Sequence, residues 1–149
     1  MKTPRAPNTL IGIAGVHYVV SELSMRGLIA LPTIRNTAGY DIIVATSDGK
    51  HHKNLQVKAS SKRVTFWLMP PRRKIRAGPN DYYVLVRRLE KEKPPRFEAF
   101  LVSGKEAKKK LYQPKGRDLR SVGFDGRWAK NEDRERRWAK AWREWDGRA

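Results

Sequence analysis

The residues most able to do chemistry lie in two short apolar segments near the middle of the chain. Asp41 lies in the segment 40–44, and Gln56 and Lys58 lie two residues apart in the segment 55–58. Both segments have the composition of β-strands, and side chains alternate along a strand. Gln56 and Lys58 are therefore predicted to share one face. An acid, an amide oxygen and a lysine on adjacent strands can hold a divalent cation against a phosphate.

Each of these residues has a definite role in such a site. Asp41 would be the anionic ligand of Mg²⁺, with Mn²⁺ as the substitute ion. The side-chain oxygen of Gln56 and the backbone carbonyl of Val57 would add neutral ligands, and Lys58 would orient the attacking water or neutralise developing charge. A turn signal at 47–50 predicts a hairpin that makes the two strands neighbours. The alternative is an exposed turn aspartate and two solvated strand residues, because each half of the pattern is common.

The charge of the chain indicates an anionic partner. Its 149 residues include 33 Lys and Arg against 15 Asp and Glu, which leaves a net charge of +18. DNA is the leading candidate, with RNA kept as an alternative. Six basic residues in turns and loops are predicted to contact the phosphate backbone, against the alternative of solvated loops. They are Lys62, Arg63, Arg72, Arg73, Lys74 and Arg76.

Other partners and cofactors receive less support. The chain has no cysteine, which excludes disulfides and cysteine-ligated zinc. No apolar run reaches the roughly 18 residues that a membrane span needs. The apolar stretch 10–20 is interrupted by Gly12, Gly15 and His17. We interpret this stretch as an internal helix of a cytoplasmic protein that does not bind a membrane.

The order of predicted elements indicates an α/β fold with a central mixed sheet flanked by helices. A first helix spans 8–26, is capped by Asn8 or Thr9 and is ended by Gly27. It is apolar on most sides and is therefore predicted to be buried on most sides. Ser103 begins a capping box for a helix to Tyr112. Strands are predicted at 28–34, 40–46, 53–59, 63–69, 82–89 and 97–102.

The end of the chain is predicted to be irregular over 113–130 and helical over 131–145. We expect one domain, 1–149, with a core of about 8–112 and a basic helical extension of about 113–149. Trp138, Trp142 and Trp145 fall on one face of the terminal helix. They are expected to dock this helix on the body of the protein or on a second subunit, which allows a homodimer. Base stacking is the alternative role.

Most of the chain resembles the PD-(D/E)xK nuclease superfamily, which has the restriction-endonuclease-like fold, and residues 14–60 carry the diagnostic motifs. The chain looks most like small uncharacterised bacterial members related in appearance to archaeal Holliday-junction resolvases. The resemblance implies an αβββαβ core, magnesium, and DNA cleavage by the site around Asp41. The matching residues are Gly15, Glu22, Leu23, Gly27, Asn36, Gly39, Tyr40, Asp41, Gln56, Val57 and Lys58.

Because of two departures from the superfamily pattern, we keep more than one functional hypothesis. The superfamily usually has an acid where this chain has Gln56, and related proteins commonly carry a helix glutamate where this chain has Val16. His17 is a poor magnesium ligand. Glu22 lies about 120° away from Val16 around the helix axis. The leading hypothesis is a metal-dependent DNA endonuclease. The alternatives are a non-catalytic nucleic-acid-binding module and a structural protein that assembles through its tryptophan face.

Overall fold

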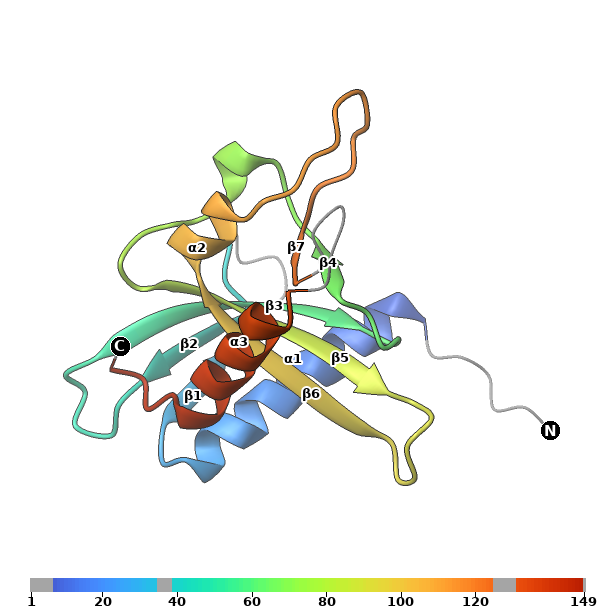
Figure 1. Cartoon of the computed structure of the whole chain (residues 1–149). Coiled ribbons are helices and arrows are strands. Elements are labelled where there is room, and N and C mark those ends of the chain that lie inside the picture. Colours follow the sequence, from blue (N-terminus) through green and yellow to red (C-terminus); the bar gives the residue numbers. More distant parts are fainter. Residues whose placement is uncertain (1–6, 35–38, 125–130, 149) are drawn as a thin grey trace.

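A five-stranded mixed sheet forms the centre of the computed structural model, which describes residues 7–34, 39–124 and 131–148. The sheet has the order β1-β2-β3-β5-β6, and α1 lies along one of its faces (Figure 1). Neighbouring strands are antiparallel except for the parallel pair β3 and β5. The predicted mixed sheet flanked by helices is confirmed. The strands are β1 (Ile29–Pro32), β2 (Ile42–Ala45), β3 (His52–Ser60), β5 (Asp81–Leu89) and β6 (Arg96–Ser103).

Helix α1 (Asn8–Met25) is buried along one stripe rather than on most sides. The stripe recurs every four residues, at Ile11, Gly15, Val19 and Leu23, whereas Met25 is exposed. Burial on most sides was therefore a wrong prediction. Gly15 allows this stripe to lie close to the sheet, because a Cβ at position 15 would lie only 2.7 Å from the Cβ of Ala59 in β3. No side chain caps the first turn, but a glycine with positive φ ends the helix as expected.

The connection from β3 to β5 departs from the αβββαβ order that the resemblance implies. Between these strands lie β4 (Phe66–Leu68) and the 3₁₀ turn η1 (Arg72–Lys74), and the described residues 61–80 contain no α-helix. Strand β4 pairs with β7 (Ser121–Gly123) in a second, antiparallel sheet. Strand β7 was not predicted from the sequence, because three residues are too few to show alternation.

Both C-terminal helices begin at side-chain caps. Helix α2 (Gly104–Lys109) is capped by Ser103, whose Oγ accepts a hydrogen bond from the backbone N–H of Glu106 at 3.1 Å. Helix α3 (Glu132–Glu144) is capped by Asn131, whose Oδ1 accepts from the backbone N–H of Arg134 at 2.9 Å. These caps confirm the predicted starts of both helices. None of the described helices is long and apolar enough to cross a membrane.

The tryptophan face of α3 packs inside its own chain. Trp138, Trp142 and Trp145 are 1%, 3% and 6% exposed. The expectation that these tryptophans dock the helix on the body of the protein is therefore confirmed, and this face is not open to join a second subunit or to stack on bases. The segment 113–149, expected as an extension, also supplies β7.

Two apolar clusters fill the space on either side of the sheet. Trp142 and Trp145 belong to the cluster on the α1 side, and Trp138 belongs to the cluster beneath β4 and β7. Helix α3 therefore closes both clusters. The first cluster includes Val19, Leu23, Ile42, Val44, Leu55, Val84 and Val86, and the second includes Trp67, Ile75, Tyr83, Leu85, Phe100 and Phe124.

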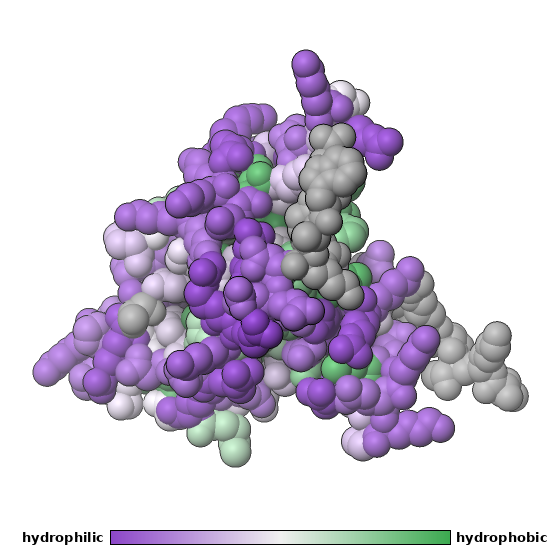
Figure 2. Space-filling model, viewed as in Figure 1, coloured by the Kyte–Doolittle hydropathy of each residue, from purple (hydrophilic) through white to green (hydrophobic). Residues whose placement is uncertain are grey.

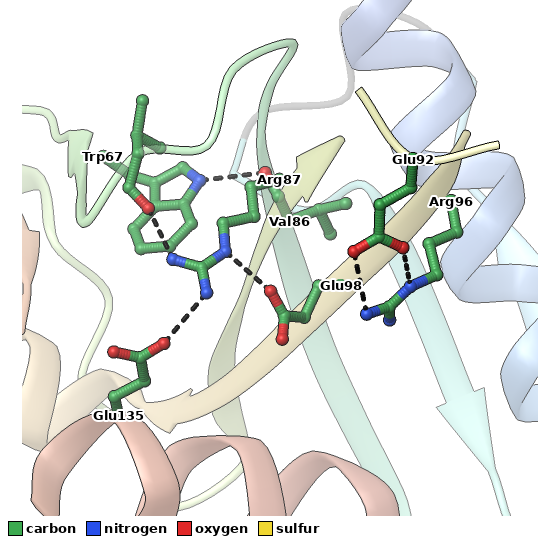
Figure 3. A network of polar contacts seen from close by, with 8 residues as sticks. Trp67, Val86, Arg87, Glu92, Arg96, Glu98 and Glu135 are labelled. Carbon is green, nitrogen blue, oxygen red and sulfur yellow. Dashed lines mark hydrogen bonds and ion pairs between the residues drawn. The ribbon is translucent and has the colours of Figure 1, made fainter. Parts of the chain in front are cut away.

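A buried arginine joins two strands of the main sheet to α3 and to the segment before β4 (Figure 3). The Arg87 guanidinium of β5 donates to Glu98 of β6 at 2.8 Å and to Glu135 of α3 at 2.9 Å. It also donates to the backbone carbonyl of Val64 at 2.8 Å and lies 4.9 Å from the ring centroid of Phe100. The arginine side chain is 3% exposed. A cation this deeply buried is tolerated because its donors are satisfied.

Candidate functional site

Asp41 occupies the point where β2 and β3 separate. The register of the two strands ends with Ile42 opposite Leu55, and the backbone N–H of Asp41 donates to the Leu55 carbonyl at 2.8 Å. Two residues after Leu55 along β3, the N–H of Val57 donates to Asp41 Oδ2 at 2.7 Å. The carboxylate thus replaces the backbone partner that β2 no longer offers. This contact fixes the acid against β3.

A cavity of about 460 Å³ opens beside this aspartate, between α1 and the ends of β1 and β2. Asp41 and Val57 line it on the sheet side, and Val16 and His17 line it on the helix side. The cavity therefore contains one carboxylate and an apolar side chain where a second carboxylate would be needed to bind a divalent ion strongly.

Gln56 and Lys58 lie on the opposite face of β3 from this cavity. Val57 packs against the cluster on the α1 side, whereas Gln56 is in register with Tyr83, which belongs to the other cluster. Alternation then places Gln56 and Lys58 together on the second face, and neither lines the cavity. The structure thus brings Asp41 to the backbone of Val57 without placing all three predicted side chains in one cavity.

The amide of Gln56 contains a buried oxygen without a partner. Its Oε1 makes no hydrogen bond to any described residue. A buried acceptor left unsatisfied costs about 1–3 kcal/mol, so such an atom calls for a ligand. A water molecule or a hard cation would satisfy it, since Mg²⁺ prefers oxygen donors and keeps several waters.

The three oxygen donors of the predicted site have the chemistry that magnesium prefers, with a single negative charge, but only Asp41 and Val57 line the cavity. Asp41, the Gln56 oxygen and the Val57 carbonyl are all oxygen donors from adjoining positions of two paired strands. Among the residues that the structure describes, no group of three or more His, Cys, Asp or Glu side chains could hold a metal ion. Ion binding at this site would therefore be weak compared with sites that use two or three carboxylates.

The charge of Asp41 also reaches the second face of the sheet. Burial raises the pKa of Tyr83 above its usual value, and the charges of Asp81 and Asp41 act in the same direction. The backbone and the guanidinium of Arg76 act against this shift. Tyr83 is the strand partner of Gln56. The charge of Asp41 therefore acts on a residue that lies beside Gln56.

The raised pKa of Tyr83 predicts a loss of stability at alkaline pH. Its contribution is fully present below about pH 10, where unfolded tyrosine is neutral. It is lost as the pH rises through the folded pKa, because only the unfolded chain then ionises freely. Urea unfolding at pH 9 and pH 11 should therefore show a smaller loss for Tyr83→Phe than for the unaltered protein. An equal loss in both proteins would contradict this assignment.

The resolvase Hjc of Archaeoglobus fulgidus has a similar structure. Hjc is a Holliday junction resolvase, and the two structures superpose with a TM-score of 0.47 at 11% sequence identity. The match covers 75% of this chain and 83% of the Hjc chain. No protein-family profile matches this sequence, and no curated protein matches it.

Arg76 lies beside the residues that lead into Asp41. Its guanidinium lies 4.8 Å from the ring centroid of Tyr40 and 3.4 Å from the tyrosine hydroxyl. A Cβ on Gly39 would come within 2.2 Å of the arginine Nε, and this glycine has a φ of +93°. Glycine therefore gives the arginine room to lie next to the candidate site.

The other predicted basic residues lie in two places. Lys62 and Arg63 are exposed just after β3. Arg72, Arg73 and Lys74 are exposed in η1, and the Arg72 guanidinium donates to the backbone carbonyl of Lys108 near the end of α2. This contact joins η1 to α2, which is a second basic segment. Figure 2 shows hydrophilic residues over much of the face of the molecule that it displays. The added lysines are Lys105, Lys108, Lys109 and Lys110.

Sequence reasoning missed the α2 lysines, although three of them are consecutive. These lysines differ from the basic residues of α3, some of which are paired with acids of their own helix. There Arg136 forms ion pairs with Glu132 and Asp133 of the same helix, and these internal pairs leave less net charge for a partner. Arg137 pairs with Glu106 of α2 at 2.7 Å. The joined η1 and α2 segments are therefore the better candidate for backbone phosphates.

Proposed function

We propose that this protein is a metal-dependent DNA endonuclease with a reduced metal site. The observation that carries the proposal is the buried, partnerless oxygen of Gln56, next to the residue whose N–H binds the Asp41 carboxylate. Oxygen donors of this kind suit a magnesium ion, and the net charge of +18 suits the phosphate backbone.

The residues have distinct roles in this proposal. Asp41 would hold the ion with the Val57 carbonyl as a further donor, and the Gln56 oxygen would have to reach it from the other face of β3. A bound divalent cation activates water and neutralises charge on the phosphate. Lys58 donates to a phosphate oxygen from the same face of β3 as Gln56. Arg76 and the η1 residues hold the backbone on either side of the scissile phosphate.

A second candidate function is nucleic-acid binding without cleavage. It is favoured by Val16, which lines the Asp41 cavity where a further carboxylate would be expected. In this alternative the same basic surface binds the backbone and the Asp41 carboxylate serves only to hold the end of β3.

A cleavage assay separates the two candidates. Supercoiled, linear and branched DNA are incubated with the protein in Mg²⁺ or Mn²⁺, beside Asp41→Ala and Lys58→Ala. We expect each variant to cut at least about a hundredfold more slowly, because each removes a group that stabilises charge in the transition state. Asp133→Asn, on the exposed side of α3, is the matched control and should cut normally. Equal cutting by all proteins would indicate a contaminating nuclease, and binding without cutting would support the second candidate.

Salt dependence tests the basic surface independently of cleavage. If all six predicted residues neutralise phosphates, duplex affinity should fall by roughly a thousandfold between about 50 and 200 mM salt. Replacing Arg72, Arg73 and Lys74 together by alanine should reduce the logarithmic salt slope by about three. Anisotropy titrations with duplex DNA and with RNA measure both quantities. Failure to bind any nucleic acid at low salt would contradict both candidate functions.

A further inference from the structure

The small sheet formed by β4 and β7 has one buried face and one exposed apolar face. On β4, Trp67 is 3% exposed and packs into the second cluster, whereas its neighbours Phe66 and Leu68 are 46% and 61% exposed. This alternation turns two large apolar side chains to solvent. A soluble chain seldom exposes adjacent large apolar side chains on a strand without a use for them.

A third exposed ring extends this face. Ser121 of β7 is paired on one side with Leu68 and on the other with Tyr112, so these residues lie side by side and share a face. The ring of Tyr112 is 39% exposed. Opposite Phe66 stands Gly123, where a Cβ would lie 2.0 Å from the backbone oxygen of Thr65, so no side chain covers the phenyl ring from that position. We call Phe66, Leu68 and Tyr112 the outer β4–β7 face.

The segments that adjoin the outer β4–β7 face in the chain are rich in basic residues. Arg63 precedes β4, and Lys110 lies two residues before Tyr112. The loop that leads into β7 is also basic, and its acid Asp118 is paired with Arg120. Between 108 and 120 the chain has six basic residues and this single acid. The six are Lys108, Lys109, Lys110, Lys115, Arg117 and Arg120.

We propose that the outer β4–β7 face binds unpaired bases of single-stranded DNA. Every base has an apolar π-face that can stack on an aromatic ring, and the backbone that joins the bases is anionic. An exposed apolar surface with two aromatic rings, adjoined by basic segments, matches both properties. A second copy of this chain, or another basic protein, would have to bring like charges together around the apolar contact. The inference rests on the proposed function in one respect, that the partner is DNA, and it adds a preference for unpaired segments.

Paired binding assays test this proposal. A labelled oligothymidylate of about twelve nucleotides and a duplex of the same length are titrated with the protein, with Phe66→Ala and with Tyr112→Ala. We expect each variant to lose roughly five- to a hundredfold in affinity for the single strand, since one stacked base is lost. Duplex affinity should change less than about twofold, because it depends on phosphate contacts. Leu31→Ala removes an apolar side chain of similar exposure from β1 and should leave both affinities unchanged.

Crosslinking of the unaltered protein keeps the test decisive if a variant folds poorly. Bromodeoxyuridine in the oligonucleotide should crosslink to the peptides that contain Phe66 or Tyr112, and crosslinks confined to other peptides would overturn the proposal. Equal losses on single-stranded and duplex DNA, or no loss on either, would also overturn it. A changed oligomeric state in Phe66→Ala would assign the face to a second copy. If duplex binding and cleavage persist in any of these cases, the proposed nuclease function survives the loss of this inference.

Discussion

Replacing Arg87 with methionine is expected to lower the free energy of unfolding by about 3 kcal/mol. Methionine fills most of the space but removes the donors to Glu98, Glu135 and the Val64 carbonyl. The two carboxylates would then face each other without a cation. Because they are about one-third exposed, the loss should fall at the low end of the range for breaking a buried ion pair. Urea denaturation monitored by tryptophan fluorescence measures this difference.

Two comparisons identify the cause of this destabilisation. Arg136→Met removes an arginine of α3 whose side chain is 69% exposed, and it should cost less than about 0.5 kcal/mol. Adding Glu98→Gln and Glu135→Gln to Arg87→Met should restore part of the lost stability by removing the unpaired charges. If the triple variant is no more stable than the single one, lost packing rather than lost pairing is responsible.

Introducing glutamate at position 16 is expected to strengthen metal binding at Asp41. Val16 and Asp41 line the same cavity, so Val16→Glu adds a second carboxylate to a site that has one. The added charge should raise the affinity for Mn²⁺ by about tenfold or more. Isothermal titration calorimetry measures the change directly. Nuclease activity should rise as well, if occupancy by the ion limits it.

The matched control for this variant is Leu10→Glu. Leu10 is exposed on α1 outside the cavity lining, so it adds the same charge at a distance from Asp41 and should change metal affinity much less. Combining Val16→Glu with Asp41→Ala should abolish the gain, because the two acids are expected to bind one ion. A gain that persists in the double variant would show that the ion is held elsewhere.

The sequence was a good guide to local geometry at the candidate site. The turn signal at 47–50 predicted the hairpin of β2 and β3, and alternation predicted that Gln56 and Lys58 share a face. The position of Asp41 could not be predicted, because it depends on where β2 leaves β3. That point is fixed by tertiary contacts and has no signal in composition or spacing.

Long-range contacts account for the other differences. Arg87 follows Val86 in β5 and precedes Arg88, and no periodicity tells which arginine is buried. Arg87 is the buried arginine because it pairs with Glu98 and with Glu135, which lies 48 residues away in the chain. Likewise α1 is apolar on several sides, and Gly15 selects the buried stripe only through its contact with β3.

The late position of the closing elements has a consequence for the synthesis of this protein. Strand β4 finds its partner in β7, and both apolar clusters are closed by tryptophans of α3. All of these partners are translated after the five strands of the main sheet are complete. A nascent chain that ends near residue 112 would leave Trp67 and the β5 and β6 residues of both clusters open to water. The two clusters therefore stay open until α3 has left the ribosome, and until then the nascent chain exposes apolar surface of the kind that chaperones bind.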